Sequence, residues 1–170
     1  MLRLLTGAPR SRHQLEQALA RRDVPEDVAA AVLDRFTEVG LIDDAEYAQI
    51  LVRSQRESRG LARRALALEL RRRGVGDDDA RAALAGVEAD DEEATARQLL
   101  ERRWRTGRNL SPEVRSRRAL AMLARKGYPG SLAGRLVREM LADEPAEADT
   151  GRGMSEDDDA AWDPGESTPD

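Results

Sequence analysis

The stretch GLIDDAEYAQILVRSQRESRG, residues 40–60, places two adjacent carboxylates in front of an apolar, helix-compatible run. Asp43 is a favoured N-cap residue, and Glu46, three positions later, completes the spacing of a capping box. Asp44 would then lie in the first turn, where the helix dipole favours a negative charge. Gly60 suits the left-handed conformation that often ends a helix. The stretch therefore predicts a helix that begins after Asp43 and ends at Gly60.

The two carboxylates have an alternative interpretation as a catalytic or metal-binding pair. Such a pair needs further ligands or an acid–base partner, and none lies nearby in the sequence. The flanking residues favour a helix instead. Ile42 and Tyr47 have the spacing of a hydrophobic staple, and Tyr47, Ile50 and Leu51 share one helical face. We therefore interpret both carboxylates as helix-initiating residues.

The composition favours an all-helical, non-secreted protein. The chain has 170 residues, of which 40% are hydrophobic and only 3% aromatic. A core must then be built mainly from Leu, Ala and Val, and no segment shows the alternating pattern of a strand. The absence of cysteine excludes disulfides, thiolate metal sites and cysteine nucleophiles. The longest apolar run, VAAAVL, is too short to cross a membrane, and no secretion signal is evident, so we expect a cytoplasmic protein.

Further helices are predicted by the same start and stop signals. Asp77 or Asp78 is expected to cap one helix, and Asp90 or Asp91 a second. Ser111 followed by Pro112 marks a third N-terminus. One expected helix starts within GDDDARAAL (76–84), and the others cover residues 61–73, 91 to about 105, 112–126 and about 131–142.

Three segments repeat one pattern: LARRDVPEDVAAAVL (19–33), LRRRGVGDDDARAAL (70–84) and LARKGYPGSLAGRLV (123–137). The alignment matches a leucine at the start and a cation three residues later, and it continues through a small apolar residue into a second helix. Each copy predicts a helical hairpin, with a third helix following the first two copies. Units of this size bury their faces by stacking, so we expect an extended, curved helical array. The expected repeats cover about 1–59, 60–108 and 109–141.

The charge is divided unevenly along the chain. Residues 1–141 carry 27 Lys and Arg against 22 Asp and Glu, whereas residues 142–170 carry one Arg against 11 Asp and Glu. The acidic segment 142–170 has almost no large aliphatic residues, so we predict a disordered acidic C-terminal tail. One hypothesis is that this tail folds back on the basic body and mimics phosphate. The alternative is a tail that only increases solubility.

Several motifs resemble the central block of the RecX family, the bacterial regulators of the RecA recombinase. They are Gly40-Leu41-Ile42-Asp43-Asp44, Tyr47-Ala48, Arg53, Arg59-Gly60, and Leu68-Glu69-Leu70 followed by Arg73-Gly74-Val75. Upstream, LLTGAPRSRHQLEQALARRDVP resembles the first repeat of that family, and LARKGYPGSLAGRLV resembles its last. The resemblance covers residues 1–141. It departs at the acidic tail and at a first helix shorter than is usual, so either translation starts upstream of Met1 or the first repeat is truncated.

The resemblance implies an elongated all-α molecule in which a three-helix repeat is used three times. It implies binding to the filament of RecA on single-stranded DNA, in its helical groove, with weak direct or indirect contact to the DNA. It also implies limited filament growth and repression of ATPase and strand exchange, in DNA repair, recombination and the SOS response. The family has no known catalytic residues or cofactor, and we expect a monomer that is not an enzyme and needs no cofactor or metal.

Basic clusters are the candidate surfaces for the RecA filament or DNA, because arginine grips carboxylate and phosphate with paired hydrogen bonds. The alternative for each arginine is a solvated helix face or a partner of the helix dipole. The candidates are Arg53, Arg56, Arg59, Arg63, Arg64, Arg71, Arg72, Arg73, Arg102, Arg103, Arg105, Arg108, Arg115, Arg117, Arg118, Arg125 and Lys126.

The aromatic residues and the single histidine are expected to be structural. Trp104 follows Leu100 by four residues on one face, which favours packing over base stacking. Tyr47 and Tyr128 are interpreted in the same way, and His13 has no obvious relay partner. A DNA-binding helical module that acts without a recombinase remains the alternative function. No segment carries the Asn, Gln and Arg spacing of a base-reading helix, and no motif supports an enzyme.

Overall fold

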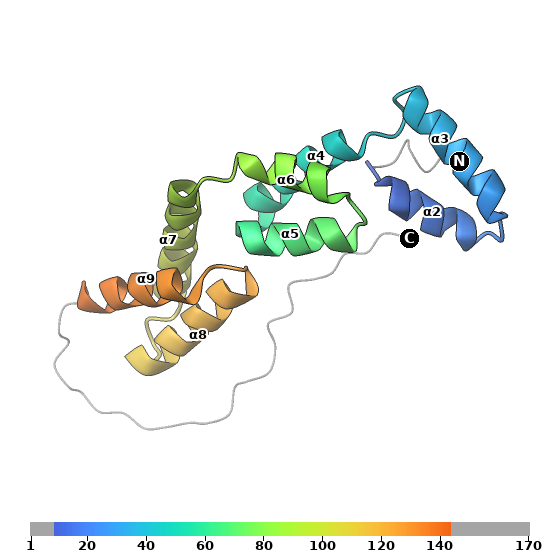
Figure 1. The fold of residues 1–170 in the computed structure, drawn as a ribbon. Helices are drawn as coiled ribbons and strands as arrows, with labels where there is room; N and C mark the ends of the chain where they lie inside the picture. The colour runs from blue at the N-terminus through green and yellow to red at the C-terminus, as the bar shows by residue number, and fades with distance from the viewer. Residues whose placement is uncertain (1–8, 144–170) are drawn as a thin grey trace.

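Every regular element in residues 9–143, the part of the chain that the computed structural model describes, is an α-helix. The helices are α2 (Arg12–Ala20), α3 (Glu26–Glu38), α4 (Asp44–Arg59), α5 (Arg63–Arg72), α6 (Asp77–Ala85), α7 (Ala89–Thr106), α8 (Pro112–Arg125) and α9 (Gly130–Ala142) (Figure 1). The predicted all-α fold is confirmed. The predicted tail lies outside the described residues from position 144 onward.

Helix α4 confirms the interpretation of the stretch at 40–60. The Asp43 side chain accepts a hydrogen bond from the Glu46 N–H at 2.8 Å, and Gly60 ends the helix with φ 59°. The buried side of α4 differs in part from the expectation. Ile50 is 38% exposed, because the core face follows Tyr47, Ala48, Leu51 and Val52 instead.

Two predicted caps are wrong, by one or two residues for α6 and by two or three for α7. Gly76 is the N-cap of α6 and Glu88 that of α7, so Asp77, Asp78, Asp90 and Asp91 lie inside the first turns. A run of carboxylates leaves the cap position ambiguous, because each of them is favourable anywhere in the first turn. Ser111 is confirmed as the cap of α8, where its hydroxyl accepts from the Val114 N–H and Pro112 follows.

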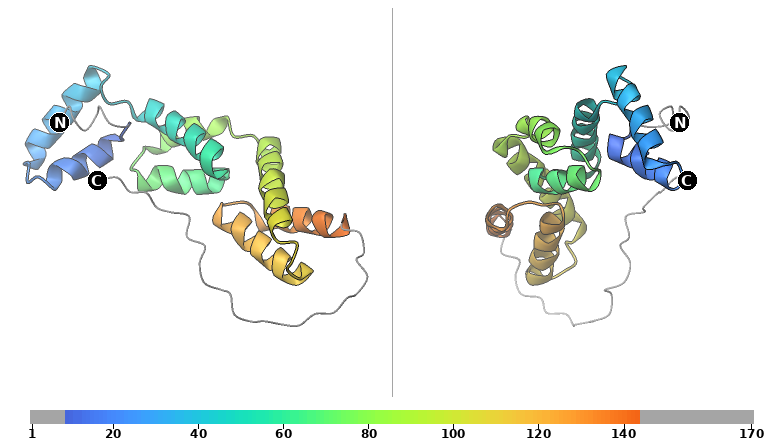
Figure 2. Two further views of the ribbon diagram at one scale, coloured as in Figure 1. Left: turned by 180° about the vertical axis from the view of Figure 1, so that it is seen from behind. Right: turned by 45° about the vertical axis from the view of Figure 1, so that its right-hand side comes forward.

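The molecule is elongated, with three groups of helices in chain order along its length (Figures 1 and 2). Helices α4, α5 and α6 share one core and α7, α8 and α9 a second, while α2 and α3 pack together with Ile42. Each long helix thus packs with the hairpin that follows it in the sequence. We call α2–α3 unit 1, α4–α6 unit 2 and α7–α9 unit 3. The boundaries expected at 59/60 and 108/109 stay a prediction.

The turns of the three hairpins share one backbone conformation. Asp23, Gly74 and Gly127 follow the first helix of each hairpin with φ of 56°, 71° and 89°. These residues are 51 and 53 positions apart, the offsets of the sequence repeat. The left-handed conformation favours Gly and tolerates Asp.

Equivalent contacts join successive units end to end. The Ser11 hydroxyl, at the start of α2, donates to the carbonyl oxygen of Arg73 at the end of α5. The N–H of Ala62, at the start of α5, donates to the carbonyl oxygen of Lys126 at the end of α8, at 2.9 Å. The positive end of one helix therefore meets the negative end of the next. These contacts between units fix the distances between the surface residues of one unit and those of the next.

Candidate functional site

The candidate arginines of unit 2 fall into two groups, those engaged inside the unit and those that face solvent. Arg63 donates to the carbonyl oxygen of Leu84 at 2.8 Å, and Arg73 pairs with Glu69 at 2.8 Å and donates to the Tyr47 hydroxyl at 3.2 Å. These contacts hold α5 against α6 and α4. The side chains of Arg63 and Arg73 therefore have structural roles.

Helix α5 turns its remaining candidates outward. Arg64, Arg71 and Arg72 are exposed, and Leu68, half exposed, lies on the same side of the helix. Arg59, at the end of α4, is also exposed and donates to the amide oxygen of Gln55 at 3.3 Å. These four guanidinium groups are accessible to a partner.

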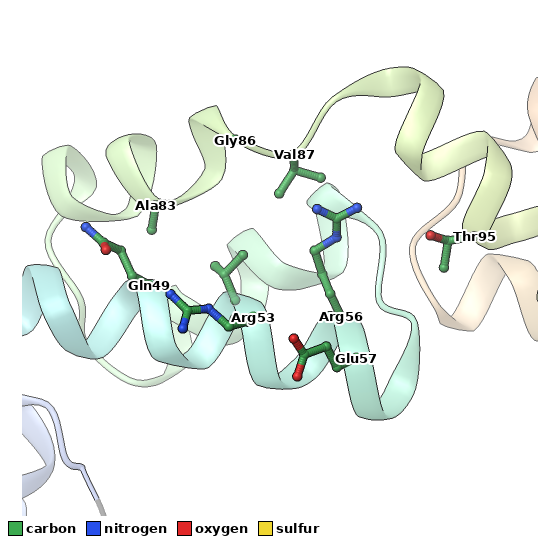
Figure 3. Close-up of a pocket in the computed structure, with 9 residues that line it drawn as sticks. Gln49, Arg53, Arg56, Glu57, Ala83, Gly86, Val87 and Thr95 are labelled. Atoms are coloured by element: carbon green, nitrogen blue, oxygen red, sulfur yellow. The ribbon is translucent and has the colours of Figure 1, made fainter.

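An open groove runs between α4 and α6 and reaches the start of α7. Gln49, Arg53 and Arg56 project from α4 into it, opposite Ala83 and Val87 (Figure 3). Arg56 approaches Asp91 of α7 at 3.8 Å, and Glu57 also lines the groove. The groove carries both signs of charge, and its exposed cation is Arg53.

Two clusters that the sequence separates meet at the bend between α7 and α8. Residues 102–118, which we call the elbow, form the end of α7, the turn and the first half of α8. The elbow encloses a pocket of about 280 Å³. Candidates from both clusters line it: Arg103, Arg115 and Arg118. The others in the elbow are exposed: Arg102, Arg105, Arg108 and Arg117.

Trp104 is structural, as predicted. It is 5% exposed, belongs to the core of unit 3, and carries the Arg115 guanidinium 5.0 Å from its ring centroid. Tyr128 is equally buried, and its hydroxyl donates to the carbonyl oxygen of Gly60 at 2.9 Å. Burial raises the pKa of Tyr128 to about 12, so the hydroxyl remains a donor at neutral pH.

Lys126 also joins units, whereas Arg125 beside it is exposed. The Lys126 ammonium donates to the carbonyl oxygen of Arg59 at the end of α4. Burial lowers the pKa of Lys126, and the charges of Arg59 and Arg125 lower it further. Lys126 thus caps a helix of unit 2 from unit 3, as a cation at a helix C-terminus is expected to do.

Sequence reasoning missed a four-residue charge cluster between α7 and α9. Arg135 pairs with Glu93 at 2.5 Å and with Glu139 at 3.3 Å, and Arg97 pairs with Glu139 at 2.8 Å and Glu93 at 3.4 Å. The signal was available as two pairs at i, i+4 spacing, Glu93–Arg97 and Arg135–Glu139. The structure shows that both pairs face each other, so their charges cancel locally.

The described residues offer no metal centre. Within residues 9–143, no group of three or more His, Asp or Glu side chains could hold an ion. His13 lies 2.9 Å from Gln17 and 3.5 Å from Glu16. Over the same residues, no helix is long and apolar enough to cross a bilayer.

Comparison with known proteins relates the whole array to one family. The RecX first, second and third three-helix domains match residues 1–36, 43–84 and 90–137. The protein "Regulatory protein RecX" of Thermobifida fusca is 57% identical over 148 residues, covering 87% of this chain and 80% of the relative. The protein of the same name from Streptomyces coelicolor is 50% identical over 143 residues, covering 84% and 76%.

Solved structures agree with this relationship. A crystal structure of regulatory protein RecX superposes with a TM-score of 0.70 at 27% identity and covers 85% of this chain and 68% of the other. That of RecX from Lactobacillus salivarius has the same TM-score at 21% identity, covering 83% and 92%, which shows likeness of fold.

Proposed function

Because this chain belongs to the RecX family, we propose that it binds the RecA filament on single-stranded DNA and inhibits the recombinase. Inhibition would act on ATPase activity, strand exchange and filament growth, and so modulate DNA repair and recombination. The observation that carries this proposal is the presence of all three RecX domains in tandem. Relatives that share them are named regulatory proteins.

The geometry of the array supports a filament as the partner. Three units joined end to end form a long object with fixed spacing between its basic groups. Exposed arginines occur on unit 2 (Arg53, Arg59, Arg64, Arg71, Arg72) and on unit 3 (Arg102, Arg105, Arg108, Arg117, Arg125). A filament that repeats both its protein surface and its DNA phosphates offers anionic groups at repeated positions, so several arginines can engage at once.

The proposal includes a non-enzymatic mode of action. The protein would act as a cytoplasmic monomer, without a cofactor, by occupying filament surface. Binding energy from many weak arginine contacts is sensitive to salt, because each contact to phosphate releases counterions. Regulation by such contacts is reversible and needs no chemical step.

The test is the single-stranded-DNA-dependent ATPase rate of the same organism's recombinase, titrated with this protein. Suppression at much less than one copy per recombinase is expected, because a protein that blocks a growing filament silences many subunits. An unaffected ATPase rate, with DNA binding intact, would instead favour a DNA-binding helical module that acts without a recombinase.

A further inference from the structure

The elbow pocket is lined by three arginines and by no described acidic residue. Arg103 enters it from α7, and Arg115 and Arg118 enter from α8. Among the described residues that line the pocket there is no Asp or Glu. Residues 102–118 as a whole contain seven arginines and one acidic residue, Glu113. The potential in the pocket is therefore positive, and it selects for an anion.

One wall of the pocket is held in place before any ligand arrives. Gly107 leaves room for the Arg115 side chain, because a Cβ at position 107 would lie 3.3 Å from the Arg115 Cγ. The Arg115 guanidinium then rests over Trp104, which is fixed in the core. Ordering this side chain on binding costs less entropy as a result. Arg103 and Arg118, at the rim, are left to adjust to the ligand.

Half-buried arginines outside the elbow pair with carboxylates. Arg56 approaches Asp91, Arg73 pairs with Glu69, and Arg97 pairs with Glu93 and Glu139. Such pairs stabilise the packing of helices, and their opposite charges leave only a weak electrostatic field at the surface. In the elbow, Arg103 and Arg118 instead line a cavity, and no Asp or Glu is among the described residues around it.

We propose that the elbow pocket binds a phosphate group of single-stranded DNA, with Arg103 and Arg118 as its ligands and Arg115 as a fixed cationic wall. Guanidinium groups match phosphate oxygens with paired hydrogen bonds. A polyanion suits the site better than an isolated carboxylate, because the exposed Arg102, Arg105, Arg108 and Arg117 continue the basic surface outward from the pocket. This inference deepens the proposed function and rests on it, since it assigns the DNA contact within the filament complex.

The test compares two full-length double variants with the same change in charge. Arg103→Gln with Arg118→Gln removes the proposed ligands. Arg21→Gln with Arg22→Gln removes two exposed cations from unit 1, at the opposite end of the array. Binding to a fluorescently labelled oligothymidylate is measured by anisotropy across a salt series, with thermal unfolding as a check on the fold.

The pocket variant is expected to bind about tenfold more weakly at low salt. The slope of log affinity against log salt concentration should fall by about 0.7, the value for one lost phosphate contact, while the control stays near the original protein. Equal losses in both variants would overturn the inference, because only total charge would then matter. Unchanged binding in the pocket variant would overturn it as well. The assay contains no recombinase, so its outcome is separate from that of the ATPase test of the proposed function.

Discussion

The carboxylate of Asp44 accepts a hydrogen bond from the backbone N–H of Arg12, 2.8 Å away and 32 residues earlier in the chain. The same relationship joins Glu92 to the N–H of Arg63 at 2.6 Å. In both cases a carboxylate in the first turn of a long helix satisfies an unpaired N–H at the start of the preceding hairpin. The adjacent carboxylates at 43 and 44 thus have different tasks, since Asp43 caps its own helix and Asp44 caps that of its neighbour.

Replacing Asp44 with Ala is expected to lower the free energy of unfolding by about 1 kcal/mol, the usual effect of losing a cap. The control is Asp78→Ala, which removes an exposed first-turn carboxylate that pairs with Arg81 of its own helix and should cost less than about 0.5 kcal/mol. Urea unfolding followed by circular dichroism measures both. Equal effects would mean that the contact between Asp44 and Arg12 contributes nothing specific.

Gly127 is expected to tolerate no side chain, because it combines φ 89° with close packing against α5 of unit 2. A Cβ at this position would lie 2.7 Å from the backbone nitrogen of Ala65. Gly127→Ala should therefore destabilise the protein by at least about 1 kcal/mol. Gly130→Ala is the matched control, since nothing lies within 4 Å of its Cβ position and it begins α9. Melting temperatures measure both effects. If the two variants had the same melting temperature, the close packing of Gly127 against Ala65 would not contribute to stability.

The arginines of α5 should separate into structural and surface residues. Arg73→Ala loses contacts to Glu69 and Tyr47 in a half-buried setting, and we expect a loss of about 1–2 kcal/mol of stability. Arg64→Ala, which removes an exposed side chain of the same type, should change stability by less than about 0.5 kcal/mol. Urea unfolding distinguishes them. If Arg64→Ala were as damaging as Arg73→Ala, the division into structural and surface arginines would be wrong.

The sequence was sufficient to predict what depends on neighbouring residues. Helix type, the Asp43 cap, the left-handed Gly60 and the repeat offsets all follow from local pattern. It was insufficient wherever the partner lies far along the chain. Asp44 meets Arg12 across 32 residues, and Lys126 reaches Arg59 across 67. The elbow pocket likewise depends on the angle between α7 and α8, which side chains in several helices determine together.

The charge cluster of α7 and α9 predicts a pH effect on stability. Arg135 and Arg97 lower the pKa of Glu93 and of Glu139 below 4.5, the ordinary value. A lowered pKa in the folded state gives a stabilisation that is complete above pH 4.5 and is lost as the pH falls through the folded-state pKa. When the pH is lowered from 6 to 3, the melting temperature of the original protein should therefore fall further than that of the double variant Glu93→Gln with Glu139→Gln. High salt should reduce the difference, because these groups are solvent-exposed. Parallel pH profiles would refute this prediction.

The acidic segment 142–170 should compete with nucleic acid for the basic surface. It carries ten more negative than positive charges, against five net positive charges on residues 1–141, and one chain holds both. A tethered segment has a high effective concentration, so even weak contacts to arginine displace phosphate at low salt. Deleting residues 144–170 leaves every described helix intact and should raise the affinity for labelled oligothymidylate several-fold at about 50 mM salt, with the gain vanishing near 500 mM. A version with the same tail length but Ser and Gly in place of Asp and Glu separates charge from bulk, since it should behave like the deletion. Affinity that is the same with and without the tail would leave solubility as its role.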